Sequence, residues 1–229
     1  VVLGVDRAGL VGADGETHHG CFDSLFLCAI PGFTVLCPSN FAELRTMLRQ
    51  ALFDIPGPVA VRYPRGGEGA FRENKAGPAA VCLRPGTDVT LVACGILINN
   101  ALSAAELLEK KGISAEVVKL NRISPLEIRD MEGCFGHTDT LLVVEDSFGA
   151  GCVGQRLAAK LAERGMAPKK LILRNLGKTY APEGSVTELE HSFGLDAEGI
   201  AKAVEEEDGS AGAMTAEEKK ELIDDRNDA

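Results

Sequence analysis

Short apolar runs alternate with longer amphipathic segments along most of the chain. Runs rich in Val, Leu and Ile are typical of parallel strands that are covered on both faces, because such strands need no polar side. The segments between them, such as "NFAELRTMLRQALF" at residues 40–53, place apolar residues three or four positions apart, as an amphipathic helix does. The alternation predicts an α/β fold with parallel sheets.

These elements form two series along the chain. We expect strands at residues 1–6, 33–39, 57–66, 88–95, 114–121, 139–146 and 169–177, and helices at residues 21–30, 40–53, 96–112, 124–134, 147–165, 185–194 and 196–207. Ser39 or Asn40 suits the N-cap of the second helix, and Pro125 suits the first turn of the fourth. The first series therefore supplies three strands and the second supplies four.

A glycine-rich, polar stretch separates the two series. Its sequence, "GGEGAFRENKAGPAAV" at residues 66–81, is typical of a linker. We expect a first domain with its linker at residues 1–76, a second domain at residues 77–206, and an acidic, disordered tail at residues 207–229. Because the chain opens on an apolar strand without Met, we interpret it as part of a longer protein.

Charge and composition narrow the classes of partner. The net charge of −10 argues against nucleic acid and anionic membranes, since both attract clustered Lys and Arg. No apolar run is as long as a membrane span, and no signal peptide is present. The seven cysteines are scattered without a C-x-x-C pair, which favours buried, reduced thiols, and we expect a cytoplasmic protein.

The richest polar stretch, "VDRAGLVGADGETHHG", follows the first strand at residues 5–20. Ligands of parallel α/β sheets bind beyond the carboxyl ends of the strands, so this loop and "RYPRG" after the third strand should share one rim. Two arginines there, Arg7 and Arg65, would suit a phosphate or carboxylate, because a guanidinium offers a planar fork of donors. Tyr63 lies at the same rim and is a candidate substrate-binding residue.

The same loop offers candidates for proton chemistry. Asp14 and His18 could accept a hydrogen bond from a hydroxyl group or exchange a proton with a carbonyl oxygen. Only one of His18 and His19 is expected to take part, because adjacent side chains tend to point apart. From residue types alone, a glycine-rich surface loop with solvated charges explains the stretch equally well.

Other polar features have plainer explanations. The glycines that follow Glu145 and Asp146 could open an anion site at a helix N-terminus, but the two acids favour close packing of helix on sheet instead. His137 and His191 are isolated in the sequence, and we interpret them as surface or packing residues.

Several ordered motifs resemble one enzyme family. The strings "DRAGLVGADGETHHGCFD", "IPGFTVLCPSN" and "GPVAVRYPRGG", in this order, resemble the 1-deoxy-D-xylulose-5-phosphate synthases. These are thiamine diphosphate enzymes related to transketolase and to the β subunit of pyruvate dehydrogenase E1. Further along, "VACG", "KLNRISPLE" and "VVEDSFGAGCVG" resemble the C-terminal domain of that family, so the resemblance covers roughly residues 1–206.

The resemblance implies an incomplete pyrimidine-binding domain with a parallel sheet, followed by a transketolase C-terminal-type α/β domain. It implies a homodimeric enzyme that uses thiamine diphosphate and Mg²⁺ to condense pyruvate with D-glyceraldehyde 3-phosphate, with loss of CO₂. The product serves isoprenoid, thiamine and pyridoxal biosynthesis. By position in the motifs, Arg7 and Arg65 match the family's phosphate-contacting arginines, while Asp14 and His18 match residues that meet substrate oxygens near the cofactor.

Part of the family pattern is absent from this sequence. The metal and diphosphate motif, "GDG" followed later by "NN", is missing, and Asn99–Asn100 has no GDG before it. We therefore expect the chain alone to bind no cofactor or metal, to be inactive, and to need an N-terminal domain. Two alternatives stay open: the C-terminal subunit of a split transketolase, and a non-catalytic assembly domain.

Overall fold

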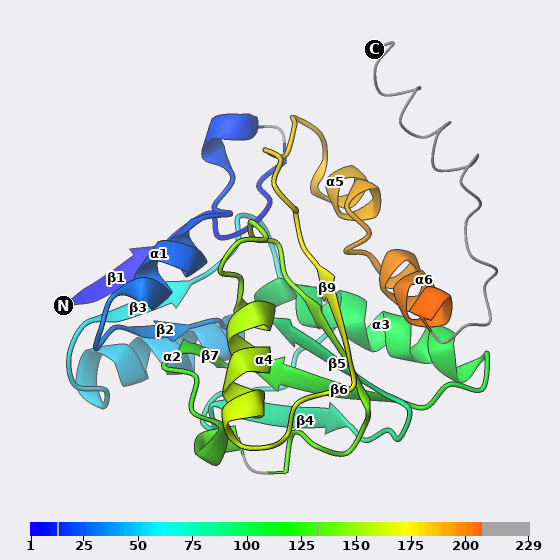
Figure 1. Cartoon of the computed structure of the whole chain (residues 1–229). Coiled ribbons are helices and arrows are strands. Elements are labelled where there is room, and N and C mark those ends of the chain that lie inside the picture. The colour runs from blue at the N-terminus through cyan, green and yellow to red at the C-terminus, as the bar shows by residue number, and fades with distance from the viewer. Residues whose placement is uncertain (13, 132, 208–229) are drawn as a thin grey trace.

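The computed structural model describes residues 1–12, 14–131 and 133–207 (Figure 1). Its strands are β1 (Val2–Val5), β2 (Thr34–Leu36), β3 (Val59–Arg62), β4 (Ala80–Arg84), β5 (Val89–Cys94), β6 (Ala115–Leu120), β7 (Arg122–Ser124), β8 (Thr140–Val144) and β9 (Lys170–Arg174). Its helices are α1 (Asp23–Ala29), α2 (Phe41–Phe53), α3 (Ile98–Glu109), α4 (Val153–Glu163), α5 (Val186–Ser192) and α6 (Ala197–Glu207), with short 3-10 helices η1 (Glu16–His18), η2 (Gly95–Leu97) and η3 (Ile128–Met131). The tail expected at residues 207–229 lies outside the described residues, apart from Glu207.

The first sheet has the strand order β1-β3-β2-β7. β3 lies between β1 and β2 and is parallel to both, so the segments that follow β1 and β3 leave the sheet at the same edge. Every residue of β2 and β3 is buried. β1 is only half-buried and, within the part of the chain that the structure describes, pairs with β3 alone, which leaves its outer edge open.

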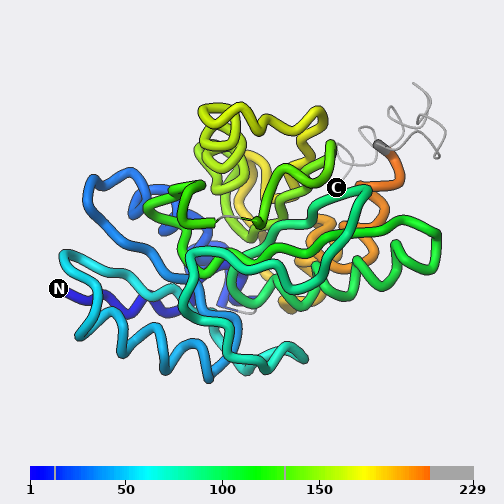
Figure 2. Tube along the Cα trace, turned by 90° about the horizontal axis from the view of Figure 1, so that it is seen from below, coloured from blue at the N-terminus to red at the C-terminus, as the bar shows by residue number. Residues whose placement is uncertain are grey.

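The second sheet has the order β4-β6-β5-β8-β9, in which all pairs except β4–β6 are parallel. Its two central strands, β5 and β6, are buried at every position, including the polar residues Thr90, Glu116 and Lys119. Helices α3 and α6 pack together and share one core cluster, while α4 contributes to another with β8 (Figure 2). None of the described helices is both long enough and apolar enough to cross a membrane.

All seven predicted strands form, and the predicted parallel α/β architecture is confirmed. The cap of α2 is Asn40, whose side chain accepts a hydrogen bond from the Glu43 backbone N–H at 2.9 Å. The seven cysteines are free thiols; five are buried, and Cys28 and Cys82 are partly exposed.

The sequence analysis missed two strands, β4 and β7, which are the two antiparallel ones. β4 begins inside the stretch predicted as a linker. The helix predicted at residues 124–134 is wrong. Its first residue, Ser124, belongs to β7, the Ser124–Pro125 peptide is cis, and among the described residues of this stretch only the short η3 is helical. The physical reason is tertiary, because β7 pairs with β2 of the first sheet. The helix predicted at residues 147–165 begins only at Val153.

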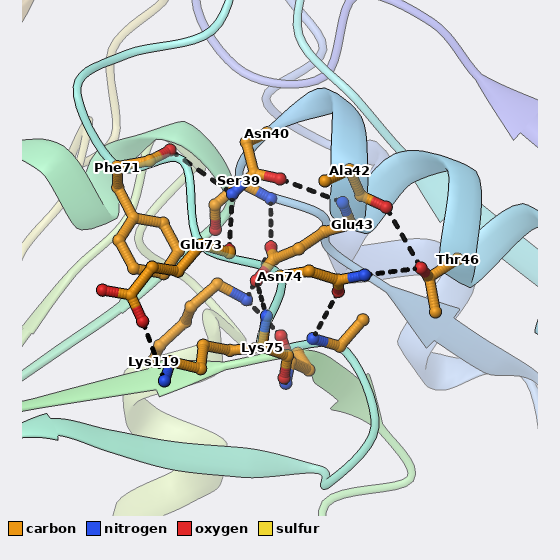
Figure 3. A network of polar contacts seen from close by, with 12 residues as sticks. Ser39, Asn40, Ala42, Glu43, Thr46, Phe71, Glu73, Asn74, Lys75 and Lys119 are labelled. Atoms are coloured by element: carbon orange, nitrogen blue, oxygen red, sulfur yellow. Dashed lines mark hydrogen bonds and ion pairs between the residues drawn. The ribbon is translucent and has the colours of Figure 1, made fainter.

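A buried ion pair joins the two halves of the chain (Figure 3). Glu43 of α2 and Lys119 of β6 are fully buried, and the Lys119 ammonium lies 3.0 Å from the Glu43 carboxylate. Glu43 also accepts hydrogen bonds from the backbone N–H groups of Ser39 at 2.8 Å and Lys75 at 3.1 Å. Burial lowers the pKa of Lys119, and the Glu43 carboxylate opposes that shift.

Three asparagines complete this arrangement, and together with Glu43 and Lys119 we call them the junction network. Asn40 donates to the Phe71 and Glu73 carbonyl oxygens, and Asn74 donates to the Thr46 hydroxyl. Asn121 accepts from Lys119 and donates to the Lys75 and Pro78 carbonyl oxygens. The stretch predicted as a linker is therefore pinned by hydrogen bonds on both sides.

Candidate functional site

The candidate site lies where β1 and β3 end. Val5 and Arg62 are paired in the register of these strands, so the segments that carry Arg7 and Arg65 start side by side. The Ala8 N–H donates to the Tyr63 carbonyl oxygen at 3.0 Å, which holds the two segments together beyond the sheet. The shared rim that the sequence predicts is confirmed.

Three charged side chains meet at this rim, and we call Arg7, Asp14 and Arg65 the rim cluster. The Asp14 carboxylate forms an ion pair with the Arg65 guanidinium and lies 3.5 Å from Nε of Arg7. Arg7 also forms a 2.6 Å ion pair with its neighbour Asp6. Hydrogen bonding from Arg65 holds the pKa of Asp14 below its ordinary value, and Arg7 adds to the effect. Asp14 is therefore a carboxylate over a wide pH range, between two guanidinium groups that face solvent.

The glycines give the loop its shape. Gly9 and Gly20 exchange backbone hydrogen bonds of 2.9 and 2.8 Å and close the loop on itself. Gly9 has a φ of +76°, and a Cβ there would lie 1.6 Å from a carboxylate oxygen of Asp146. A Cβ on Gly20 would lie 2.1 Å from the Arg7 carbonyl oxygen. Larger residues at these two positions would push the loop away from the body of the protein.

Beneath the rim lies a buried ion pair that the sequence analysis did not identify. Arg62 donates to both carboxylate oxygens of Asp23, at 2.5 and 3.1 Å, and both side chains are buried. Arg62 also donates to the Gly20 carbonyl oxygen at 3.4 Å. The pair ties the end of β3 to the start of α1 and to the end of the loop. Arg62 was predicted to lie near this rim, but its apolar neighbours gave no signal of its partner.

The two histidines of the loop have different surroundings. The described contact of the His18 ring is with the Thr17 hydroxyl at 3.1 Å, so the structure places His18 on the loop but not against the rim cluster. Nδ1 of His19 accepts from the Val11 N–H at 3.1 Å, and Nε2 lies 3.1 Å from the Pro182 carbonyl oxygen. A neutral ring with its proton on Nε2 satisfies both contacts. His19 therefore holds the loop to a segment far along the chain, a role that the sequence did not reveal.

Tyr63 and Arg65 line a cavity of about 330 Å³ between the end of β3 and the start of α2. Arg7, Asp14 and His18 do not line it. The structure therefore joins Arg7 and Arg65 through Asp14 and places Tyr63, with Arg65, in the wall of this cavity.

The start of α4 is not free for an anion, as the acids before it predicted. Glu145 accepts from the backbone N–H groups of Val153 and Gly154, both at 2.9 Å, and so occupies the place an anion would take. A Cβ on Gly154 would lie 2.4 Å from Leu173, which confirms the expected close packing of helix on sheet. His191 is exposed, and the His137 ring is half-exposed beside buried Glu116.

The family uses Mg²⁺, which phosphate-binding sites hold in near-octahedral geometry with one or two carboxylates and the phosphates themselves. Across residues 1–12, 14–131 and 133–207, no group of three or more His, Cys, Asp and Glu side chains could hold a metal ion. The described residues therefore offer no carboxylate cluster for a metal ion.

Comparison with known families gives two matches. The model for the transketolase pyrimidine-binding domain matches residues 1–67, and the model for the transketolase C-terminal domain matches residues 79–200, more than half of the chain.

Curated relatives include 1-deoxy-D-xylulose-5-phosphate synthases from several bacteria. The chain is 39% identical over 214 residues to the synthase of Chlorobium luteolum and 37% identical over 212 residues to that of Desulfitobacterium hafniense. Each match covers 90% of this chain and 33% of the relative. The chain thus spans about a third of the length of these relatives.

Among solved structures, the chain is similar to a split gene transketolase described as an inactive β4 tetramer. The TM-score is 0.77 at 26% identity, and the match covers 90% of this chain and 65% of that one.

Proposed function

This chain belongs to the transketolase C-terminal domain family, with a match to the pyrimidine-binding domain before it, and from that premise we propose that it is part of a 1-deoxy-D-xylulose-5-phosphate synthase. In the complete enzyme, pyruvate and D-glyceraldehyde 3-phosphate condense with loss of CO₂. Identities of 37–39% with named synthases support the proposal. The same premise suggests a cytoplasmic homodimer that serves isoprenoid, thiamine and pyridoxal precursor synthesis.

The observation that carries the proposal is the rim cluster. Arg7 and Arg65 come from different loops and converge on one carboxylate, which shows that both guanidinium groups reach the same point. A phosphate at that point would accept charge-assisted hydrogen bonds from both. Asp14, held as a carboxylate, would accept a hydrogen bond from a substrate hydroxyl, and His18 would reach a substrate oxygen by turning from Thr17. Tyr63 would support Arg65 from the adjoining cavity.

The position of the cofactor is part of the proposal. Because the "GDG" and "NN" motif of the family is missing from this sequence, we propose that thiamine diphosphate and Mg²⁺ are held by the part of the enzyme that the relatives have outside the matched third. The role of this chain is to bind and orient the phosphorylated acceptor.

The open edge of β1 supports the proposal that another segment of the complete enzyme pairs with this strand. Leu3 is 40% exposed, and the outer backbone groups of a strand without a second neighbour are a template for pairing. On α1, Phe22, Phe26 and Ile30 are also exposed, at four-residue spacing on one side of the helix. We propose that the first part of the pyrimidine-binding domain covers this edge.

The test is acceptor kinetics in an enzyme assembled from this chain and an N-terminal part taken from a relative. Arg7→Ala or Arg65→Ala should lower kcat/KM for glyceraldehyde 3-phosphate by roughly 10- to 150-fold, the loss of one charged hydrogen bond. Arg→Lys should recover only part of the activity, and the apparent affinity for pyruvate should change far less. Equal losses with unphosphorylated glyceraldehyde would show that the arginines do not bind the phosphate.

The solved split transketolase favours one alternative, a transketolase subunit. The choice of donor separates the two reactions: the synthase uses pyruvate, and a transketolase uses a ketose phosphate. A non-catalytic assembly domain would support neither reaction when assembled. The chain by itself should show no turnover with either donor.

A further inference from the structure

The polar loop at residues 7–20, here called the rim loop, packs against the second domain near its start. Leu10 is buried in the same core cluster as Leu176, which follows β9. Gly12 is also buried, and a Cβ on it would lie 3.1 Å from the Gly184 carbonyl oxygen. The loop that carries the candidate site of the first domain therefore lies against a segment of the second.

His19 closes the part of the rim loop that carries the candidate groups. Its Nδ1 accepts a hydrogen bond from the Val11 N–H at 3.1 Å, so the ring joins the two ends of the segment at residues 11–19. Asp14 and His18 lie inside this segment. The backbone hydrogen bonds described inside it each span three residues, so they shape its turns without closing its ends.

The other nitrogen of the same ring anchors the closed segment to the second domain. Nε2 of His19 lies 3.1 Å from the Pro182 carbonyl oxygen. A neutral ring with its proton on Nε2 donates to Pro182 while Nδ1 accepts from Val11, so one side chain serves both contacts. Asp14 is thus held from one side by the anchored loop and from the other by the arginines that follow β1 and β3.

The ion pairs of the rim cluster are too exposed to hold the loop by themselves. The side chains of Arg7 and Arg65 are 44% and 50% exposed, and exposed pairs stabilise a structure little. The contacts of His19 are of a different kind, because Val11 is buried and its N–H would lose its described acceptor if the ring were removed. The histidine contributes more to the position of the loop than the charges do.

We propose that His19 is a positioning residue for the rim cluster. Through its bridge to Pro182, the second domain holds Asp14 in its ion pairs with the two arginines. Without the ring the segment is no longer closed, and Asp14 leaves both guanidinium groups more often. The consequence for acceptor binding rests on the proposed function, whereas the effect on the rim cluster does not.

The experiment measures, by NMR on the full chain, how fast the guanidinium N–H protons of Arg7 and Arg65 exchange with water. His19→Ala should speed this exchange by about 2- to 5-fold, the range over which an exposed ion pair can act. His19→Gln keeps an N–H donor near the place of Nε2 and should recover part of the protection. In a chain that carries Asp14→Asn, His19→Ala should add nothing, because the histidine acts through that carboxylate.

Asn100→Ala is the matched control for a loss of stability alone. The Asn100 amide also serves two contacts, donating to the Glu190 carboxylate and the Leu195 carbonyl oxygen, but neither partner belongs to the rim loop. Urea unfolding should show that His19→Ala and Asn100→Ala are both less stable than the parent. Only His19→Ala should speed guanidinium exchange.

Acceptor kinetics in the assembled enzyme separate this proposal from the proposed function. His19→Ala should lower kcat/KM for glyceraldehyde 3-phosphate by the factor by which exchange rises, because the competent arrangement is populated less. If Arg7→Ala and Arg65→Ala impair the acceptor step and His19→Ala does not, the positioning role is overturned. If none of the three affects that step while exchange still responds to His19→Ala, the proposed function fails and the positioning role stands.

Three results on the chain alone would overturn the proposal: unchanged exchange in His19→Ala, an equal change in Asn100→Ala, or a full additional effect of His19→Ala beside Asp14→Asn. One measurement needs no variant and remains decisive if His19→Ala fails to fold. Proton–nitrogen correlation NMR of the parent should show the His19 ring with its proton on Nε2 alone. A proton on Nδ1 would prevent that atom from accepting from Val11, and the bridge would not exist.

Discussion

The rim cluster and the junction network both join distant segments through ionic contacts, but the charged side chains of the rim are open to solvent while those of the junction are buried. The side chains of Arg7 and Arg65 are 44% and 50% exposed, whereas those of Glu43 and Lys119 are 0% exposed. Every contact of the rim can be exchanged for one with a ligand at small cost, because solvent already competes for it. In the junction network, Glu43 and Lys119 form no ion pair with any other described residue, so each charge depends on the other.

This difference in exposure distinguishes the rim cluster, a candidate binding site, from the junction network, which has a structural role. Asp14 lies between two arginines, and its ion pairs hold both guanidinium groups in place at a surface that solvent can reach. Glu43 accepts from three directions within the protein and offers nothing to a ligand. The following predictions test this comparison.

The largest effect is expected from Lys119→Met. This change leaves the Glu43 carboxylate buried without its cation, which should lower the free energy of unfolding by about 3–5 kcal/mol. Urea unfolding followed by circular dichroism measures it. The double variant Lys119→Met, Glu43→Leu should recover most of the loss, because no charge then remains buried. If Lys119→Met lowers the free energy of unfolding by less than ~1 kcal/mol, water must reach Glu43 and the junction is not fully buried in solution.

A smaller loss is expected when the loop of the rim is forced away from Asp146. Gly9→Ala combines an unfavourable positive φ with a Cβ only 1.6 Å from a carboxylate oxygen, and should cost at least ~2 kcal/mol. Gly112→Ala is the matched control: this glycine follows α3 with a φ of +81° and has nothing within 4 Å of its Cβ, so only the backbone cost of about 1 kcal/mol applies. Thermal unfolding of both variants compares them. Equal costs would contradict the predicted contact.

Removing the central charge of the rim should affect stability much less. Asp14→Asn breaks both ion pairs, yet exposed pairs contribute only about 0–1 kcal/mol. Because the pKa of Asp14 is lowered, its stabilisation is present above its ordinary pKa and is lost as the pH falls through the lowered value. Unfolding measured at low and high salt should show a small difference between variant and parent that disappears at high salt. A difference above ~2 kcal/mol would place Asp14 among the structural residues.

The smallest effect concerns His191, which is far from both clusters along the chain. Its Nδ1 lies 2.6 Å from Asp196, and this hydrogen bond raises the pKa of His191 above its ordinary value of 6.5. The stabilisation is complete below pH ~6.5 and is lost as the pH rises through the raised value. An NMR titration of the ring should show a higher pKa in the parent than in Asp196→Asn. Identical titration curves would show that the pair does not form in solution.

The pattern of apolar and polar residues was sufficient to predict the strands and helices whose burial follows the usual period. The strands from β1 to β3 and the buried β5 and β6 follow from their apolar runs. The meeting of the two polar loops at one rim could also be predicted from the sequence. The carboxyl ends of neighbouring parallel strands lie at the same edge of a sheet, whatever the rest of the fold is. The resemblance in the motifs added the roles of Arg7, Asp14, His18 and Arg65, and the position of Tyr63 at the rim suggested a role for it. For these roles the contacts of the rim cluster are support, and the assignments remain predictions.

What the sequence by itself determined was therefore the periodic part of the protein: the parallel strands, the amphipathic helices and the polar loop between them. Only the tertiary structure decided the pairing of β7 with β2, the burial of Lys119 beside Glu43 and the place of His19. The reason is physical, because periodicity reports which face of a local element is buried but not which distant segment buries it. Lys119 lies in a strand and Glu43 in a helix 76 positions earlier, and no local pattern connects them. Their pairing exists because α2 of the first domain packs there against β6 of the second and leaves each charge no other charged partner among the described residues.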